Sequence, residues 1–112
     1  MEEREYTFLQ NESCMGFLQR TLGGKVNANI IKEIDILLEI IIPEISDSDY
    51  SLTISHQAAE IGITISHSGK AIKEDLMGIV DDRVDSLRYR HLSKDRHTLK
   101  IRKKTIRKEI YE

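Results

Sequence analysis

The most constraining stretch of this sequence runs from Ile30 to Ile42 and reads IIKEIDILLEIII. Its apolar residues recur at helical spacing as two neighbouring stripes, which together are too wide for a helix lying on the surface. These stripes are Ile30, Ile34, Leu37 and Ile41, and beside them Ile31, Leu38 and Ile42. The pattern predicts a central core helix that begins after an N-cap at Asn27 or Asn29. Pro43 has no amide hydrogen for the Glu39 carbonyl, so we expect the helix to kink or end there.

The chain before this helix predicts two further elements. Residues 4–10 alternate weakly between apolar and polar side chains, which indicates a short edge strand. The run NESCMGFLQRTL then places Met15, Leu18 and Leu22 at helical spacing before the Gly23–Gly24 pair. We therefore expect a first helix that ends at these glycines.

The chain after the core helix predicts two hairpins separated by a helix. We expect strands over residues 50–56 and 60–67, a short helix over 71–82 with Ile72, Leu76 and Ile79 on one face, and strands over 85–92 and 97–104.

The two faces of these strands differ sharply in chemistry. One parity carries Leu52, Ile54, Ile61, Ile63, Ile65, Leu87, Tyr89, Leu99 and Ile101, and the other Ser51, Thr53, Ser55, Thr64, Ser66, Arg88, Arg90, Lys100 and Arg102. This alternation is typical of an antiparallel or mixed sheet that helices cover on one face and water covers on the other. We predict an α+β fold, a two-layer α/β sandwich, as one domain over residues 1–112.

Length and composition limit the class of protein. The chain has 112 residues, of which 39% are hydrophobic and 32% charged, enough for one core. Its single cysteine, Cys14, excludes an internal disulfide framework, and the start MEEREYTFLQ lacks a secretory pattern. The apolar run at 30–42 is too short to span a bilayer. These features favour a protein of the reducing cytoplasm.

The net charge of −2 hides a strong asymmetry along the chain. Residues 1–82 contain 6 Lys and Arg against 15 Asp and Glu, whereas residues 83–112 contain 11 against 4. The basic part either binds an anionic partner or neutralises the acidic part. Strand parity places five of its cations on one face: Arg88, Arg90, Lys100, Arg102 and Lys104. Few aromatic residues accompany them, so no base-stacking platform is predicted.

Single polar residues give weaker signals. His56 and His67 fall at opposite ends of their predicted hairpin, too far apart to share a metal ion. Cysteine pairs and closely spaced histidines are also lacking, so we expect no metal site. His67 is interpreted as a structural histidine at a strand end. Glu39 lies at the margin of an apolar helix, where it either lines a cleft or reaches solvent.

The order of these pieces resembles the GHKL superfamily of ATP-binding domains, especially the small anti-sigma-factor serine kinases of bacteria. FLQRTL resembles the first helix of that family, and IIKEIDILLEIIIPEI resembles the helix that bears the N-box. LTISHQAAEIGITISHSGKAI resembles the hairpin ending in the adenine-contacting box, and LMGIVDDRVDSLRYRHLSKDRHTLKIRKK the second glycine box with the closing hairpin. The similarity covers nearly the whole chain. It implies a protein partner, such as a sigma factor or its regulator, and a homodimer.

Several residues keep the family's pattern and others depart from it. Glu39 matches the general-base glutamate, and Gly69 and Gly78 match glycines of the two nucleotide boxes. His67 stands where an aspartate would accept the adenine amino hydrogen, and an unpaired buried donor costs about 1–3 kcal/mol. Pro43 replaces the magnesium-binding asparagine.

The second glycine box and the lid are altered as well. Leu76 replaces the first glycine of that box, where the family needs close backbone approach to phosphate. The six residues between Gly69 and Leu76 leave no room for the family's long lid. His67, Gly69 and Gly78 would then form a vestigial nucleotide site.

Three hypotheses follow from these patterns. The first is a degenerate ATPase-fold domain that acts as a protein-interaction or regulatory module, with no cofactor and no ATP turnover. The second is an active anti-sigma-type serine protein kinase, with Glu39 as base and ATP and magnesium bound. The third is nucleic-acid binding through the basic C-terminal hairpin.

Overall fold

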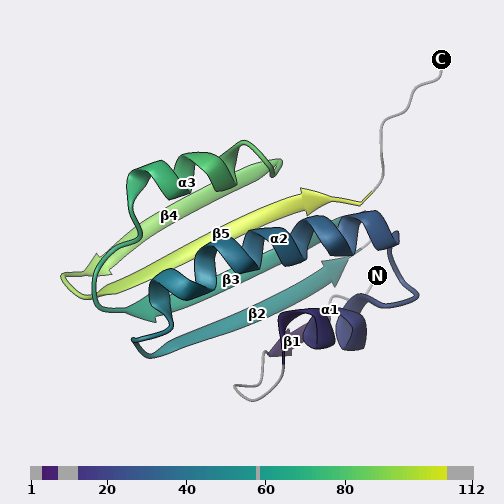
Figure 1. Ribbon diagram of the computed structural model, residues 1–112, viewed down its shortest axis with the longest axis horizontal. Helices are drawn as coiled ribbons and strands as arrows, with labels where there is room; N and C mark the ends of the chain where they lie inside the picture. Colours follow the sequence, from purple (N-terminus) through teal and green to yellow (C-terminus); the bar gives the residue numbers. More distant parts are fainter. Residues whose placement is uncertain (1–3, 8–12, 58, 106–112) are drawn as a thin grey trace.

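The computed structural model describes residues 4–7, 13–57 and 59–105 and arranges them in two layers (Figure 1). In chain order the elements are β1 (Arg4–Thr7), α1 (Cys14–Leu22), α2 (Ala28–Ile45), β2 (Tyr50–Gln57), β3 (Glu60–Ser68), α3 (Glu74–Asp81), β4 (Ser86–Ser93) and β5 (Arg96–Lys104). The strands form one antiparallel sheet in the order β1-β2-β3-β5-β4.

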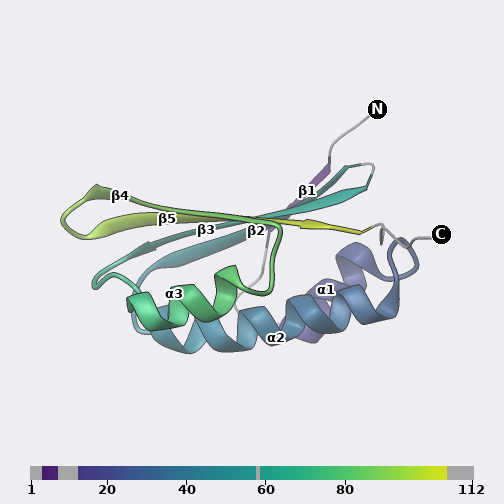
Figure 2. The same cartoon turned by 90° about the horizontal axis from the view of Figure 1, so that it is seen from above.

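The three helices of the described residues lie on one face of this sheet, and none of them covers the other face (Figure 2). α2 runs across the middle of the sheet and contacts α1 on the β1 side and α3 on the β4 side. The predicted α+β two-layer sandwich is therefore confirmed. The edge strand is confirmed at residues 4–7, while residues 8–10 of that prediction lie outside the described part of the chain.

Side-chain caps explain where α1 and α2 begin. The hydroxyl of Ser13 accepts from the amide of Gly16 at 3.0 Å, and the side chain of Asn27 accepts from the amide of Asn29 at 2.7 Å. Each contact satisfies an amide that has no partner inside its helix. Asn27, rather than Asn29, is thus the N-cap of α2. α1 ends before Gly23 as predicted.

We expected α2 to kink or end at Pro43, and the second alternative is wrong, because the helix continues to Ile45. Pro43 lies in its last turn, where the Glu39 carbonyl loses its intrahelical donor on an exposed side of the helix. Ile45 is only 2% exposed. Its burial against the core holds the last turn in helical conformation despite the proline.

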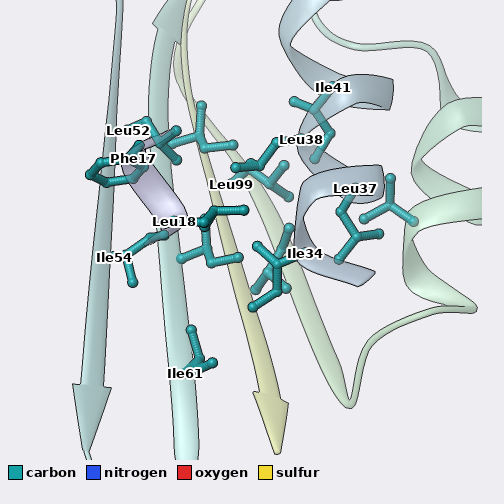
Figure 3. Close-up of a cluster of buried hydrophobic side chains, with 14 of the residues drawn as sticks. Phe17, Leu18, Ile34, Leu37, Leu38, Ile41, Leu52, Ile54, Ile61 and Leu99 are labelled. Carbon is teal, nitrogen blue, oxygen red and sulfur yellow. The ribbon is translucent and has the colours of Figure 1, made fainter. Parts of the chain in front are cut away.

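The core lies between the helices and the inner face of the sheet (Figure 3). Leu37, Leu38 and Phe17 on the helices are each 0% exposed. They face buried strand residues such as Leu52, Ile54, Ile61 and Leu99. The apolar parity predicted for the strands is the buried one, with Leu87 and Tyr89 half-buried at the β4 edge.

Two predicted helix faces need correction. Met15 in α1 is 37% exposed, and Phe17 packs into the core instead. In α3 the buried residues are Met77 and Val80, whereas Ile79 is 44% exposed. α3 begins only at Glu74, so Ile72 lies before the helix and does not set its buried face. In the described residues, no helix combines the length and apolar character that crossing a bilayer requires.

Neighbouring residues of α2 allow a direct test of this packing. We expect Leu37→Ala to lower the free energy of unfolding by about 2–5 kcal/mol, since it removes buried methyl groups and leaves a cavity. The matched control Ile36→Ala, at a position that is 36% exposed, should change it by only about 0.5 kcal/mol. Urea unfolding of both variants checks this prediction. Equal losses would contradict the orientation of α2.

Candidate functional site

Glu39, the predicted general base, lies exposed on α2. Its negative charge and that of Asp35 act on Cys14 of α1, so Glu39 projects toward the α1 side of the helix layer. Burial, aided by these two carboxylates, raises the pKa of the Cys14 thiol. Cys14 is therefore held as a thiol and is not an activated nucleophile.

Gly69 and Gly78, the matched glycines, occupy different settings. Gly69 has φ +84°, a conformation that favours glycine, and it follows the end of β3. Its amide donates to the Asp95 carbonyl at 2.9 Å, which ties this turn to the β4–β5 turn. Gly78 lies inside α3 and is exposed, so it does not present its amide at a helix start. α3 and α1 flank opposite sides of α2, and the structure does not bring Gly78 and Glu39 together.

His67 is 1% exposed and both of its ring nitrogens have partners. Its Nδ1 lies 3.1 Å from the Ser68 carbonyl, and its Nε2 lies 2.8 Å from the Tyr89 hydroxyl. The same hydroxyl accepts from the Ile72 amide at 2.9 Å. The predicted structural role of His67 therefore has a concrete form: it links the end of β3 to β4 and to the segment before α3.

Two further histidines, which the sequence interpretation missed, extend this network. His97 on β5 is 4% exposed, and its Nε2 lies 2.8 Å from the Gly69 carbonyl. Its Nδ1 lies 2.7 Å from Nδ1 of His91 on β4. The centroids of the His67 and His97 rings are 4.9 Å apart. We call His67, Tyr89, His91 and His97 the histidine cluster.

The acceptors fix where the ring hydrogens of this cluster lie. A carbonyl can only accept, so His67 carries its hydrogen on Nδ1 and His97 carries one on Nε2. The neutral His67 ring then accepts the Tyr89 hydroxyl hydrogen at Nε2. When His91 and His97 are both neutral, Nδ1 of His97 carries no hydrogen and accepts the Nδ1 hydrogen of His91. In this form both ring nitrogens of His67 and of His97 have hydrogen-bond partners.

The sequence did contain a signal for this cluster. His97 shares the parity of Leu99 and Ile101, and His91 shares that of Leu87 and Tyr89. A regular hairpin turning at residues 93–96 would pair residue 91 with residue 98, but the register shifts between His91 and Ser93 and places His91 opposite His97. His56, in contrast, lies at the far end of β2 opposite Ile61, well away from the cluster.

The surroundings of His67 and Tyr89 favour their neutral forms. Burial lowers the pKa of His67, and positive charge on His97, Arg96 and His91 lowers it further, against the Ser68 carbonyl that raises it. Burial also raises the pKa of Tyr89, although the amide of Ile72 partly offsets this. Within the described residues, no group of three or more His, Cys, Asp or Glu side chains is placed to hold a metal ion.

The five cations chosen by strand parity lie together on the open face of the sheet. They are Arg88 and Arg90 on β4, and Lys100, Arg102 and Lys104 on β5, and all are exposed. The register places Arg88 directly opposite Lys100. We call these residues the basic face.

The residues that continue the basic face across the sheet next to Arg88 and Lys100 are small and polar. Across β3 and β2 the row of Arg88 and Lys100 continues with Thr64 and Thr53. A hollow of about 360 Å³ opens on this face, lined by Gly62, Ile63, Thr64, Ser86, Arg88, Lys100, Ile101 and Arg102.

Lys103 lies between Arg102 and Lys104 in the sequence but does not belong to the basic face, because alternate residues of a strand point to opposite faces of the sheet. It points to the helix side, where its Nζ lies 2.8 Å from Glu33 and donates to the Arg83 carbonyl at 3.1 Å. The positive charge of Lys103 is thus neutralised inside the molecule. On the open side, Arg102 approaches Glu60 at 3.8 Å, with both side chains largely exposed. An ion pair that is this exposed contributes little to the free energy of unfolding.

Comparison with protein-family models gave no match, and comparison with curated proteins gave none either.

The lowered pKa of His67 predicts how stability changes with pH. The unfolded chain, with an ordinary imidazole pKa of about 6.5, takes up the proton first as pH falls. The free energy of unfolding should therefore decrease between about pH 7 and pH 5. His67→Gln removes the titrating imidazole and with it this pH dependence, so the difference in free energy of unfolding between parent and variant should narrow as pH falls. Urea unfolding of both proteins between about pH 7 and pH 5 measures this difference. A difference that stays constant would contradict the lowered pKa of His67.

Proposed function

We propose that this chain is a regulatory binding module of the histidine-kinase-like ATPase fold that acts by binding a partner and does not turn over ATP. The observation that carries the proposal is the state of His67. Its Nε2, the atom that would have to accept an adenine hydrogen, is hydrogen-bonded to Tyr89 and excluded from solvent. A nucleotide would have to break this contact and leave the Tyr89 hydroxyl hydrogen without its acceptor.

The matched glycines support the same proposal. The carbonyl of Gly69 accepts from His97 and its amide donates to Asp95, so both backbone groups are used inside the fold. Gly78 lies in the middle of a helix, where its amides are not available as a phosphate-binding terminus. The positive φ of Gly69 is by itself a reason for a glycine at this position, and no ligand is needed to explain it.

The kinase alternative would need Glu39 beside the transferred phosphate. Glu39 lies exposed on the α1 side of α2, whereas Gly78 lies on α3 at the other side. Pro43, at the position of the magnesium-binding asparagine, offers no side-chain oxygen. We therefore favour the non-catalytic module, with a protein partner and a homodimer as the family resemblance implies.

A thermal-shift series with millimolar Mg·ATP tests this proposal. Ligand well above its dissociation constant stabilises a folded chain by about 3 kcal/mol, which raises the melting temperature by several degrees. We expect no such rise beyond that seen with MgCl₂ and sodium sulfate at equal ionic strength.

The basic face could bind a triphosphate on its own, so the series includes the double variant Arg88→Thr with Lys100→Thr. A rise that disappears in this variant comes from the open face and leaves the proposal intact. A rise that persists in the variant would contradict it.

A further inference from the structure

We infer that the basic face binds the phosphate backbone of double-stranded DNA. The inference goes beyond the proposed function and is independent of it, because strand alternation places the basic face on the opposite side of the sheet from the histidine cluster. It is carried by the charge, spacing and surroundings of Arg88, Arg90, Lys100, Arg102 and Lys104.

Four of these cations form no ion pair within the described part of the chain, although Glu60 is the cross-strand neighbour of Lys104. No carboxylate there lies within ion-pair distance of Arg88, Arg90, Lys100 or Lys104, and all four are exposed. Arg88 and Lys100 are cross-strand partners, and like charges directly opposite each other destabilise a sheet. This repulsion would be relieved by an anion lying over the pair.

The spacing suits a row of phosphates. Residues two apart on a strand are separated by roughly 7 Å, so Lys100, Arg102 and Lys104 extend over roughly 14 Å of β5. Arg88 and Arg90 form a second row about 5 Å away on β4. The hydroxyls of Ser86, Thr98 and Thr64 lie among or beside these rows. Arginine, lysine and hydroxyl side chains are the groups that contact nucleic-acid phosphates.

On strands β2 to β5, whose side chains the structure describes, the basic face lacks the features that other partners require. Protein interfaces are centred on apolar and aromatic anchors, and single strands are bound by stacking aromatics. The aromatic residues described on β2 and β4, Tyr50 and Tyr89, both point to the helix side. Double-stranded RNA is bound across two successive grooves over about 16 base pairs, a longer span than the basic rows offer.

The charge of the opposite layer orients the encounter. The helix side carries acidic residues on α2 and α3, among them Asp35, Glu39, Glu74 and Asp75. A polyanion is repelled by that layer and attracted by the open face, which favours one docking orientation.

Fluorescence anisotropy with a mixed-sequence DNA duplex of about 20 base pairs tests the inference. If five phosphates are contacted, the logarithm of the binding constant should fall with the logarithm of salt concentration at a slope of about −4.5, or about 500-fold between 50 and 200 mM. The double variant Arg88→Thr with Lys100→Thr should reduce the slope to about −2.7. The matched control, Lys32→Ala with Lys73→Ala, removes the same charge from the helix side and should bind like the parent.

Urea unfolding accompanies both variants, and Arg88→Thr with Lys100→Thr should be at least as stable as the parent because repulsion is relieved. If that variant failed to fold, the double variant Arg90→Thr with Arg102→Thr would replace it, with the same expected slope of about −2.7. Absent binding, or equal losses in the variant and the control, would overturn the inference. So would tighter binding of single-stranded DNA, double-stranded RNA or polyglutamate than of the DNA duplex.

Discussion

The burial of α2 against the inner face of the sheet is the constraint on which the rest of this structure depends. Its two apolar stripes require cover from several strands at once, and the alternation along β2, β3 and β5 provides it. Because the side-chain period of a strand is two, fixing which residues face α2 also fixes which residues face water. The basic face is therefore a consequence of how the core is packed.

The ends of the strands beyond the apolar core are filled by a polar network instead. His67 and His97 are buried there and Tyr89 is half-buried, and a buried polar group is stable only when its hydrogen bonds are made. The carbonyls of Ser68 and Gly69 and the amide of Ile72 supply those bonds from the chain itself. The region in which the family resemblance would place an adenine is thus occupied by the protein's own side chains, which is the basis of the proposed function.

Much of this fold follows from the sequence, since period-two and helical patterns are strong along β2, β3, β5 and α2. The strand parity also identified the basic face, including the choice of Lys104 over Lys103. The errors have physical causes. Pro43 was expected to kink or end α2, but α2 does not end there, because the burial of Ile45 outweighs a missing hydrogen bond. Leu18 and Leu22 of α1 are buried as predicted, whereas Met15 and Ile79 are exposed, because in such short helices one residue of shift changes which side chain meets the core. The histidine cluster depends on contacts between β3, β4 and β5 and on ring hydrogens, which no single segment reveals.

The hydrogen position on His67 tests the central claim, that the chain's own network fills the helix-side end of the sheet, most directly. Long-range proton–nitrogen NMR correlations distinguish the two neutral forms of an imidazole. At about pH 7.5, above the ordinary imidazole pKa of about 6.5, the structure predicts a neutral His67 with hydrogen on Nδ1 and an Nε2 that accepts from Tyr89, unchanged by Mg·ATP. Hydrogen on Nε2, or a ring whose Nε2 loses its Tyr89 partner when nucleotide is added, would contradict the account.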